Sequence, residues 1–145
     1  MCEGSIHVSM RYDLDILNEF CSEIGLNALM TDSSSLEVFV GDDAVLCFQN
    51  AKLDEDCLMG FANTPCHTHG DLMFSDHHGH FIELDPLNLL SGLCSGDVLI
   101  CEQEVSGNLV DRWLVHKVYH DELQHLMPGE RLIVRRACCA EGSTT

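Results

Sequence analysis

The sequence is poor in positive charge. Its 145 residues include only 7 lysines and arginines against 24 aspartates and glutamates, so the formal net charge is −17 at pH 7. Proteins that bind DNA or RNA displace condensed counterions with lysine and arginine side chains. The shortage of bases therefore argues against direct binding of nucleic acid, whereas a basic protein partner would be attracted and would associate faster.

Long apolar runs are also absent from the sequence. No stretch approaches the ~20 apolar residues that a membrane-spanning helix needs, which excludes such a helix. The chain has only 3 prolines and is 46% hydrophobic, which is typical of a globular protein with a real core. Because domains cluster near ~100–150 residues, we expect a single domain over residues 1–145, with a flexible C-terminal tail at 138–145.

The first residues lack the pattern of a secretory signal. Between Met1 and Ser5 there is neither a basic stretch nor an apolar segment. The nine cysteines are odd in number, and no two of them have the Cys-x-x-Cys spacing of a redox site or a zinc ribbon. We therefore expect a cytoplasmic protein whose thiols stay reduced.

The hydrophobic periodicity predicts an α+β fold, with an antiparallel sheet built from consecutive hairpins, an N-terminal helix and one or two short helices. The first helix is expected between Asp13, as its N-cap, and Gly25, as the left-handed residue after its end. Asp85 and Pro86 predict the start of a second helix, which Gly92 would end after about two turns.

Alternating apolar residues and turn residues predict the strands of this sheet. We expect hairpins with strands at 36–40 and 44–48, at 71–74 and 80–84, and at 97–104 and 109–119. Further strands are expected at 57–61 and 131–136, with a helical turn at 121–127. In this arrangement, histidines lie in and beside the turn of the second hairpin.

Five of the nine histidines lie between His67 and His80. His67 and His69 are two residues apart, so in an extended segment both would project from the same face. Imidazole is a common ligand of zinc and iron. The candidate metal ligands are His67, His69, Asp71, His80, His116 and His120. Three ligands with an open position would make a catalytic site, and four would make a structural one.

A second interpretation of the histidine cluster needs no metal. His77 and His78 would then be solvated turn residues, and His67 and His69 would form hydrogen bonds within a loop. The string from His67 to Asp71 also resembles the first half of the metallo-β-lactamase motif His-x-His-x-Asp-His, but Leu72 stands where the motif has its next histidine. No family is assigned on that basis.

Arg112 and Trp113 are candidate interface residues, because arginine and tryptophan are over-represented among binding hot spots. The sequence has no glycine-rich phosphate loop and no dinucleotide fingerprint. A non-enzymatic role is therefore favoured: a small acidic cytosolic domain that binds a basic protein as an inhibitor, an immunity-type protein or an escort. The alternative is a zinc or iron domain, or a metal-dependent enzyme, that uses the histidine cluster. The edge strands of an antiparallel sheet can pair with those of a second copy, so the sequence does not exclude a homodimer.

Overall fold

The computed structural model describes residues 12–41, 43–50, 57–64, 67–120 and 128–138. Helix α1 (Leu14–Ile24) precedes a five-stranded sheet whose strands follow the chain order: β1 (Asn27–Asp32), β2 (Ser35–Phe39), β3 (Val45–Asn50), β4 (Cys57–Phe61) and β5 (His67–Thr68). Strands β6 (Leu72–Ser75) and β7 (Phe81–Leu84) form a separate hairpin. Helix α2 (Pro86–Ser95) then leads into a three-stranded sheet in the order β10 (Glu130–Arg135), β8 (Val98–Val105) and β9 (Asn108–His116).

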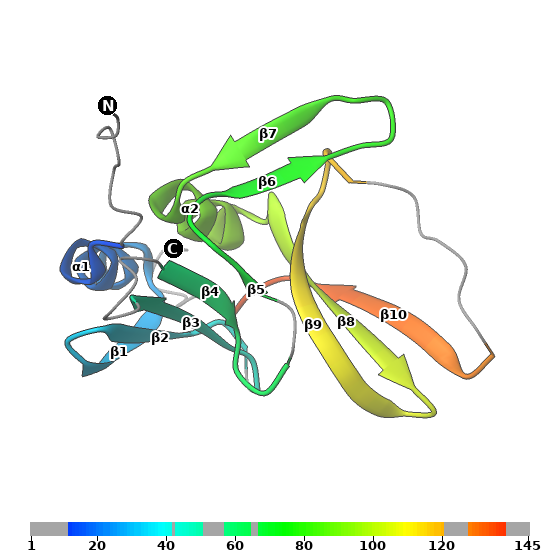
Figure 1. Cartoon of the computed structure of the whole chain (residues 1–145), viewed down its shortest axis with the longest axis horizontal. Helices are drawn as coiled ribbons and strands as arrows, with labels where there is room; N and C mark the ends of the chain where they lie inside the picture. Colours follow the sequence, from blue (N-terminus) through cyan, green and yellow to red (C-terminus); the bar gives the residue numbers. More distant parts are fainter. Residues whose placement is uncertain (1–11, 42, 51–56, 65–66, 121–127, 139–145) are drawn as a thin grey trace, which may run out of the picture.

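All strand pairs among the described residues are antiparallel, so the predicted α+β class is confirmed. The strands are divided among three sheets, a partition that the hydrophobic pattern did not specify. Figure 1 shows the β6–β7 hairpin lying over α2, with the three-stranded sheet beside the five-stranded one. No helix in the described part of the chain is long and apolar enough to cross a membrane.

Helix α1 begins and ends where the sequence predicts. The Asp13 carboxylate accepts a hydrogen bond from the Ile16 backbone N–H at 3.2 Å, and Gly25 takes the left-handed conformation with φ of 88°. Leu14, Leu17 and Cys21 are buried on one face of the helix. The apolar spacing thus fixes which side of α1 faces the core, and it leaves the other side to solvent.

Helix α2 begins as predicted but ends later. The Asp85 carboxylate accepts a hydrogen bond from the Asn88 N–H at 2.8 Å, and Pro86 occupies the first turn. The expected end at Gly92 is wrong, because the helix continues to Ser95 and Gly96 takes the left-handed conformation with φ of 89°. A Cβ atom at position 92 would lie 2.7 Å from Val98 Cγ2, so Gly92 serves close packing of helix against strand rather than helix termination.

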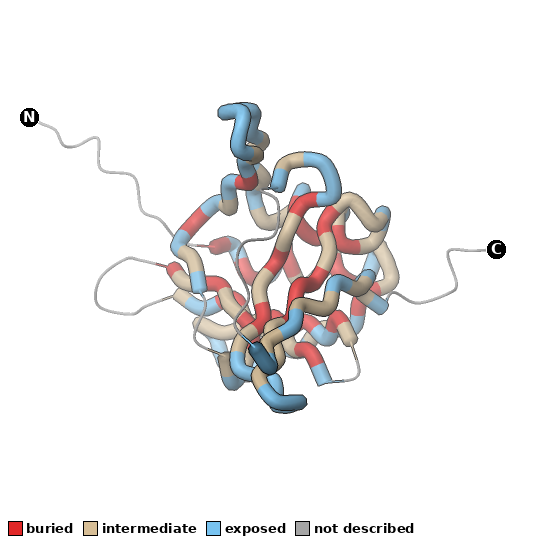
Figure 2. Tube along the Cα trace, turned by 90° about the vertical axis from the view of Figure 1, so that its right-hand side faces the viewer, coloured by how far each residue is buried: buried red, intermediate tan, exposed pale blue. Residues whose placement is uncertain are grey.

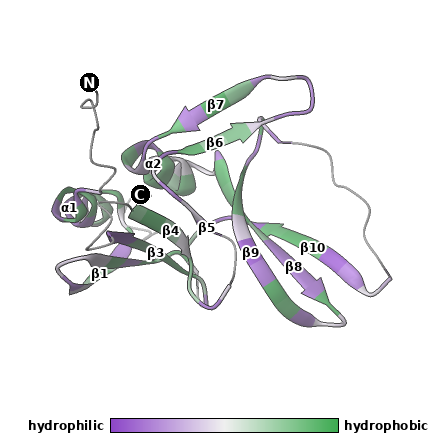
Figure 3. Cartoon of the chain, viewed as in Figure 1, coloured by the Kyte–Doolittle hydropathy of each residue, from purple (hydrophilic) through white to green (hydrophobic). Residues whose placement is uncertain are grey.

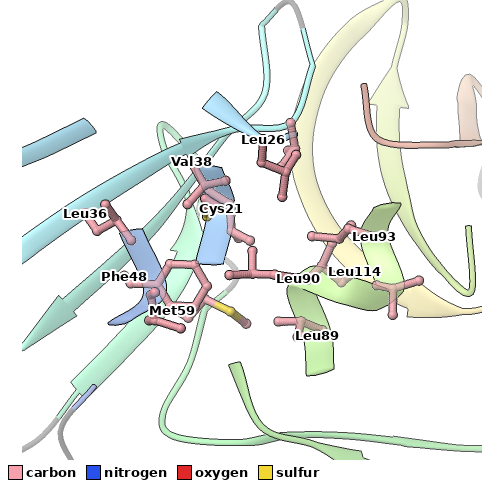
Figure 4. Packing of buried hydrophobic residues seen from close by; sticks show 14 of the residues in the cluster. Cys21, Leu26, Leu36, Val38, Phe48, Met59, Leu89, Leu90, Leu93 and Leu114 are labelled. Atoms are coloured by element: carbon pink, nitrogen blue, oxygen red, sulfur yellow. The ribbon is translucent and has the colours of Figure 1, made fainter. Parts of the chain in front are cut away.

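The core lies where the two helices meet the sheets. Figure 4 shows buried side chains of α1, α2, the five-stranded sheet and β9 gathered in one cluster, and Figure 2 shows buried segments crossing the middle of the molecule. The fully buried members of this cluster include Leu36, Val38, Leu46, Phe48, Leu90, Leu93 and Ile100. The alternation along β2 and β3 places Leu36, Val38, Leu46 and Phe48 on one face of the five-stranded sheet, and α1 packs against β1 and β2 of this sheet.

Three strands also differ from the expected ones: β1 and β5 were not predicted, and β9 is shorter than expected. The apolar residues of β1, Ala28, Leu29 and Met30, are consecutive rather than alternating with polar ones, and none of the strand's residues is buried. Strand β5 has only two residues, too few to show such a pattern. Strand β9 ends at His116 rather than near Tyr119. The helical turn expected at 121–127 and residues 139–145 of the expected tail lie outside the described residues.

Replacing Gly92 by alanine tests the close contact between α2 and β8. Alanine is the better helix former by ~1 kcal/mol, but overpacking a core costs ~1–3 kcal/mol. We expect Gly92→Ala to lower the free energy of unfolding in urea by about 1 kcal/mol. In a Val98→Ala background, where the blocking Cγ2 is gone, the same substitution should stabilise the protein, and a loss of equal size in both backgrounds would contradict the contact.

Candidate functional site

The described lysines and arginines all lie near the C-terminal sheet. They are Arg112, Lys117, Arg131, Arg135 and Arg136. Lys117 pairs with Asp97 at 2.7 Å, and Arg131 pairs with Glu104 at 2.9 Å. Arg136 donates a hydrogen bond to the backbone carbonyl of Cys94 at 3.0 Å. These cations therefore already have partners on or next to the three-stranded sheet.

Arg112 and Arg135 share two carboxylates. Arg112 Nε donates to Glu102 Oε2 at 2.8 Å, and its Nη2 lies 3.2 Å from Asp43 Oδ2. Arg135 Nη2 lies 2.7 Å from Glu102 and 3.0 Å from Asp43. The hydrogen bond from Arg135, aided by the charge of Arg112, lowers the pKa of the Asp43 carboxyl. This network joins β8, β9 and β10 to the turn before β3.

The structure places the two predicted interface residues in different environments. The Arg112 side chain is only 3% exposed, and its guanidinium also lies 5.7 Å from the centre of the Phe61 ring. Trp113 is half-buried and follows Arg112 on β9, so the two side chains point to opposite faces of the sheet. Arg112 therefore has an internal role, and the interface role of both residues stays a prediction.

Helix α1 carries acidic residues on its solvent side. Asp15, Glu19 and Glu23 recur at steps of four and are exposed. None of the described lysines or arginines forms an ion pair with them. Figure 3 shows hydrophilic residues interleaved with apolar ones along α1. This side of the molecule is therefore anionic, in contrast to the paired charges of the three-stranded sheet.

A cavity of about 530 Å³ opens between the beginnings of α1 and α2. Its acidic lining residues are Asp13, Asp71, Glu83 and Asp85, and its apolar ones include Ile16, Leu17, Pro86 and Leu87. No described lysine or arginine lines it. The cavity therefore combines apolar walls with carboxylates that have no cationic neighbour among its lining residues.

Tyr12 fixes one wall of this cavity. Its hydroxyl donates a hydrogen bond to the Gly70 carbonyl at 3.1 Å, and its ring packs edge-on against Phe48. The Asn50 side chain bonds to both the N–H and the carbonyl of Tyr12, at 2.8 and 2.9 Å. Burial raises the pKa of the Tyr12 phenol, so the hydroxyl remains a donor throughout the physiological range.

Two of the predicted metal ligands, His69 and Asp71, line the same cavity. His69 Nδ1 lies 2.8 Å from the Cys57 carbonyl oxygen, which can only accept, so Nδ1 carries a proton and only Nε2 could offer a lone pair to a metal ion. The His67 ring stands edge-on to that of His69, with 5.3 Å between centroids. The two rings therefore lie next to each other.

The other predicted ligands make different local contacts. His80 Nδ1 lies 3.2 Å from Asp76 Oδ2 beside the turn of the β6–β7 hairpin. His116 packs between the rings of Phe74 and Tyr119, and His120 follows the end of β9. Within residues 12–41, 43–50, 57–64, 67–120 and 128–138, no three His, Cys, Asp or Glu side chains form a group that could hold a metal ion. The zinc or iron site therefore stays a prediction from the sequence.

Sequence reasoning missed three of the cavity carboxylates as site residues. It identified Asp13 and Asp85 only as helix caps and did not single out Glu83. The sequence pattern around both aspartates indicates only where a helix starts. That the two helices begin at the same cavity depends on how the helices pack, which no local pattern reports.

Elemental analysis of the purified protein tests the metal hypothesis. If His67 and His69 hold zinc or iron, wild-type protein should contain about one equivalent of the metal, and the His67→Ala and His69→Ala variants should lose most of it. A Glu37→Gln variant, changed at a half-buried position on β2, provides the control. Metal content near zero in wild-type protein would contradict the hypothesis.

The buried arginine predicts a contrast in stability between two ion pairs. Breaking a buried pair costs ~3–5 kcal/mol, whereas exposed pairs contribute ~0–1 kcal/mol. We expect Arg112→Ala to lower the free energy of unfolding by about 3 kcal/mol, at the low end because Arg135 still neutralises Glu102. Arg131→Ala, whose side chain is 69% exposed, should cost less than about 1 kcal/mol. Equal losses in urea denaturation would contradict the structural role of Arg112.

His116 predicts a loss of stability in mild acid. Its Nδ1 accepts hydrogen bonds from the Val118 and Tyr119 N–H groups at 3.1 and 3.3 Å, and burial lowers the pKa of the imidazole from its usual 6.5. The unfolded chain therefore binds the proton more readily, and the stabilisation present above pH 6.5 declines as the pH falls below it.

The difference in unfolding free energy between wild type and His116→Gln measures this effect. It should change between about pH 7.5 and about pH 5.5, because glutamine keeps an acceptor but does not titrate there. His78→Gln, at an exposed turn, is the control and should follow wild type. If the difference in unfolding free energy between wild type and His116→Gln were constant with pH, this would contradict the prediction that His116 stabilises the fold as a neutral hydrogen-bond acceptor.

No family model, curated protein or solved structure matches this chain. The chemistry of its own side chains is therefore the guide to function.

Proposed function

We propose that this chain is a small acidic domain that binds a basic protein, acting as an inhibitor, an immunity-type protein or an escort. The observation that carries the proposal is the separation of charge. The described cations are held at the three-stranded sheet and its flanks, while the carboxylates on α1 and around the cavity have no described lysine or arginine beside them.

Uncompensated charge on one side of a protein acts at long range. Its field attracts a partner of opposite sign before contact and raises the association rate. The same field repels phosphate backbones, so nucleic acid is disfavoured as the ligand. The odd number of cysteines, none of them in a Cys-x-x-Cys pair, is typical of thiols that stay reduced, so the cytoplasm is the compartment proposed for this function.

Affinity capture from cells of the source organism tests the proposal. Immobilised protein should retain basic proteins at about 50 mM NaCl and release them at about 500 mM, because salt screens attraction between exposed charges. A variant with Asp15→Asn, Glu19→Gln and Glu23→Gln should retain less of the same proteins at the lower salt concentration.

The matched control changes two charged residues without changing the net charge. Lys117→Gln combined with Asp97→Asn deletes an exposed ion pair and leaves the net charge unchanged, so retention should match wild type. Association rates measured for a captured protein should fall with ionic strength in wild type. Retention that is independent of salt, or retention of acidic proteins, would contradict the proposed function.

A further inference from the structure

We propose that the cavity between α1 and α2 receives a lysine or arginine side chain of the basic partner. This inference rests on the proposed function and names the surface and the chemical group through which it acts. A long basic side chain has two parts, an apolar stem and a cationic end, and both must find complementary surroundings.

The size and the walls of the cavity suit the stem. Ligand sites commonly enclose ~300–1,000 Å³, and the volume of about 530 Å³ falls within that range. Ile16, Leu17 and Leu87 provide apolar wall, and Ile16 is 49% exposed although it is a large aliphatic residue. Covering Ile16 with a methylene chain would remove apolar surface from water, which is favourable.

The charge of the cavity suits the cationic end. Asp13 and Asp85 each cap a helix through one carboxylate oxygen, Oδ1, while Asp71 and Glu83 add two further carboxylates. The amino ends of the two helices oppose a cation with about +0.5 charge each. Four carboxylates outweigh that contribution, so the lining stays strongly negative.

The arrangement of the carboxylates favours an organic cation over a bare metal ion. A metal needs several ligand atoms converging on one point, and the described residues hold no such group of three. Carboxylates spread around a partly apolar cavity instead match a side chain that is long and charged only at its end. Tyr12, held by Gly70 and Asn50, keeps the wall rigid, which limits the ordering cost of binding.

Titration of the full chain with a capped peptide of alternating lysine and glycine tests the inference by NMR. Its Nε-acetylated form is the neutral control, and calcium chloride tests the metal alone. We expect the lysine peptide to shift the backbone amides of Gly70 and Leu87, and the acetylated peptide and calcium to leave them in place. No shift with the lysine peptide, or an equal shift with calcium, would overturn the inference.

Two variants with the same net charge separate the cavity from the general field. The cavity variant carries Asp71→Asn, Glu83→Gln and Asp85→Asn, in which asparagine preserves the helix cap. The helix variant carries Asp15→Asn, Glu19→Gln and Glu23→Gln. We expect the cavity variant to weaken peptide binding at least about tenfold and the helix variant by less than about threefold, because only the former removes direct partners of the cation.

An uncharged change checks the shape of the site. Ile16→Trp fills the cavity from a half-exposed position and should also weaken binding, without altering the net charge. Equal weakening by the cavity and helix variants would overturn the cavity inference while leaving the attraction to basic partners in place. If the retention of native partners in the affinity-capture experiment were insensitive to salt, the proposed function itself would be contradicted.

Discussion

The pairing of Arg112 with Glu102 is the interaction on which the arrangement of the two larger sheets depends. It is buried between strands of the three-stranded sheet, and through Asp43 it reaches the turn that precedes β3. Arg135 closes the network from the neighbouring strand. A buried charge is costly unless it is paired, so removal of either partner would leave an uncompensated charge at the junction of sheet and turn.

The same network explains why charge is separated across the molecule. Arginine is scarce in this chain, and the described arginines are engaged at or beside the strands that carry them. The helix side is thus left with carboxylates that have no described basic partner. The cavity lies on that side and combines those carboxylates with apolar wall, which is why a basic side chain fits it better than an anion.

Local signals predicted the elements well where one residue type decides the local conformation. Asp13 and Gly25 bound α1 because a carboxylate can cap free N–H groups and glycine tolerates positive φ. Gly92 was wrongly predicted to end α2. Glycine occurs both at helix ends, where it takes a positive φ, and where two elements pack closely. The short distance from position 92 to Val98 shows that Gly92 serves close packing. For the histidines, spacing predicted that His67 and His69 would project from one face of an extended segment, but it could not show that His116 would pack against Phe74 and Tyr119.

By itself the sequence determined the acidic character, the α+β class and the helix starts, because charge, periodicity and caps are properties of single residues and their near neighbours. The tertiary structure alone decided that the strands form three sheets, that Arg112 is internal and that two capping aspartates line one cavity. Those features join residues distant along the chain, such as Asp43 with Arg135 or Asp13 with Asp85, and only packing brings such residues together.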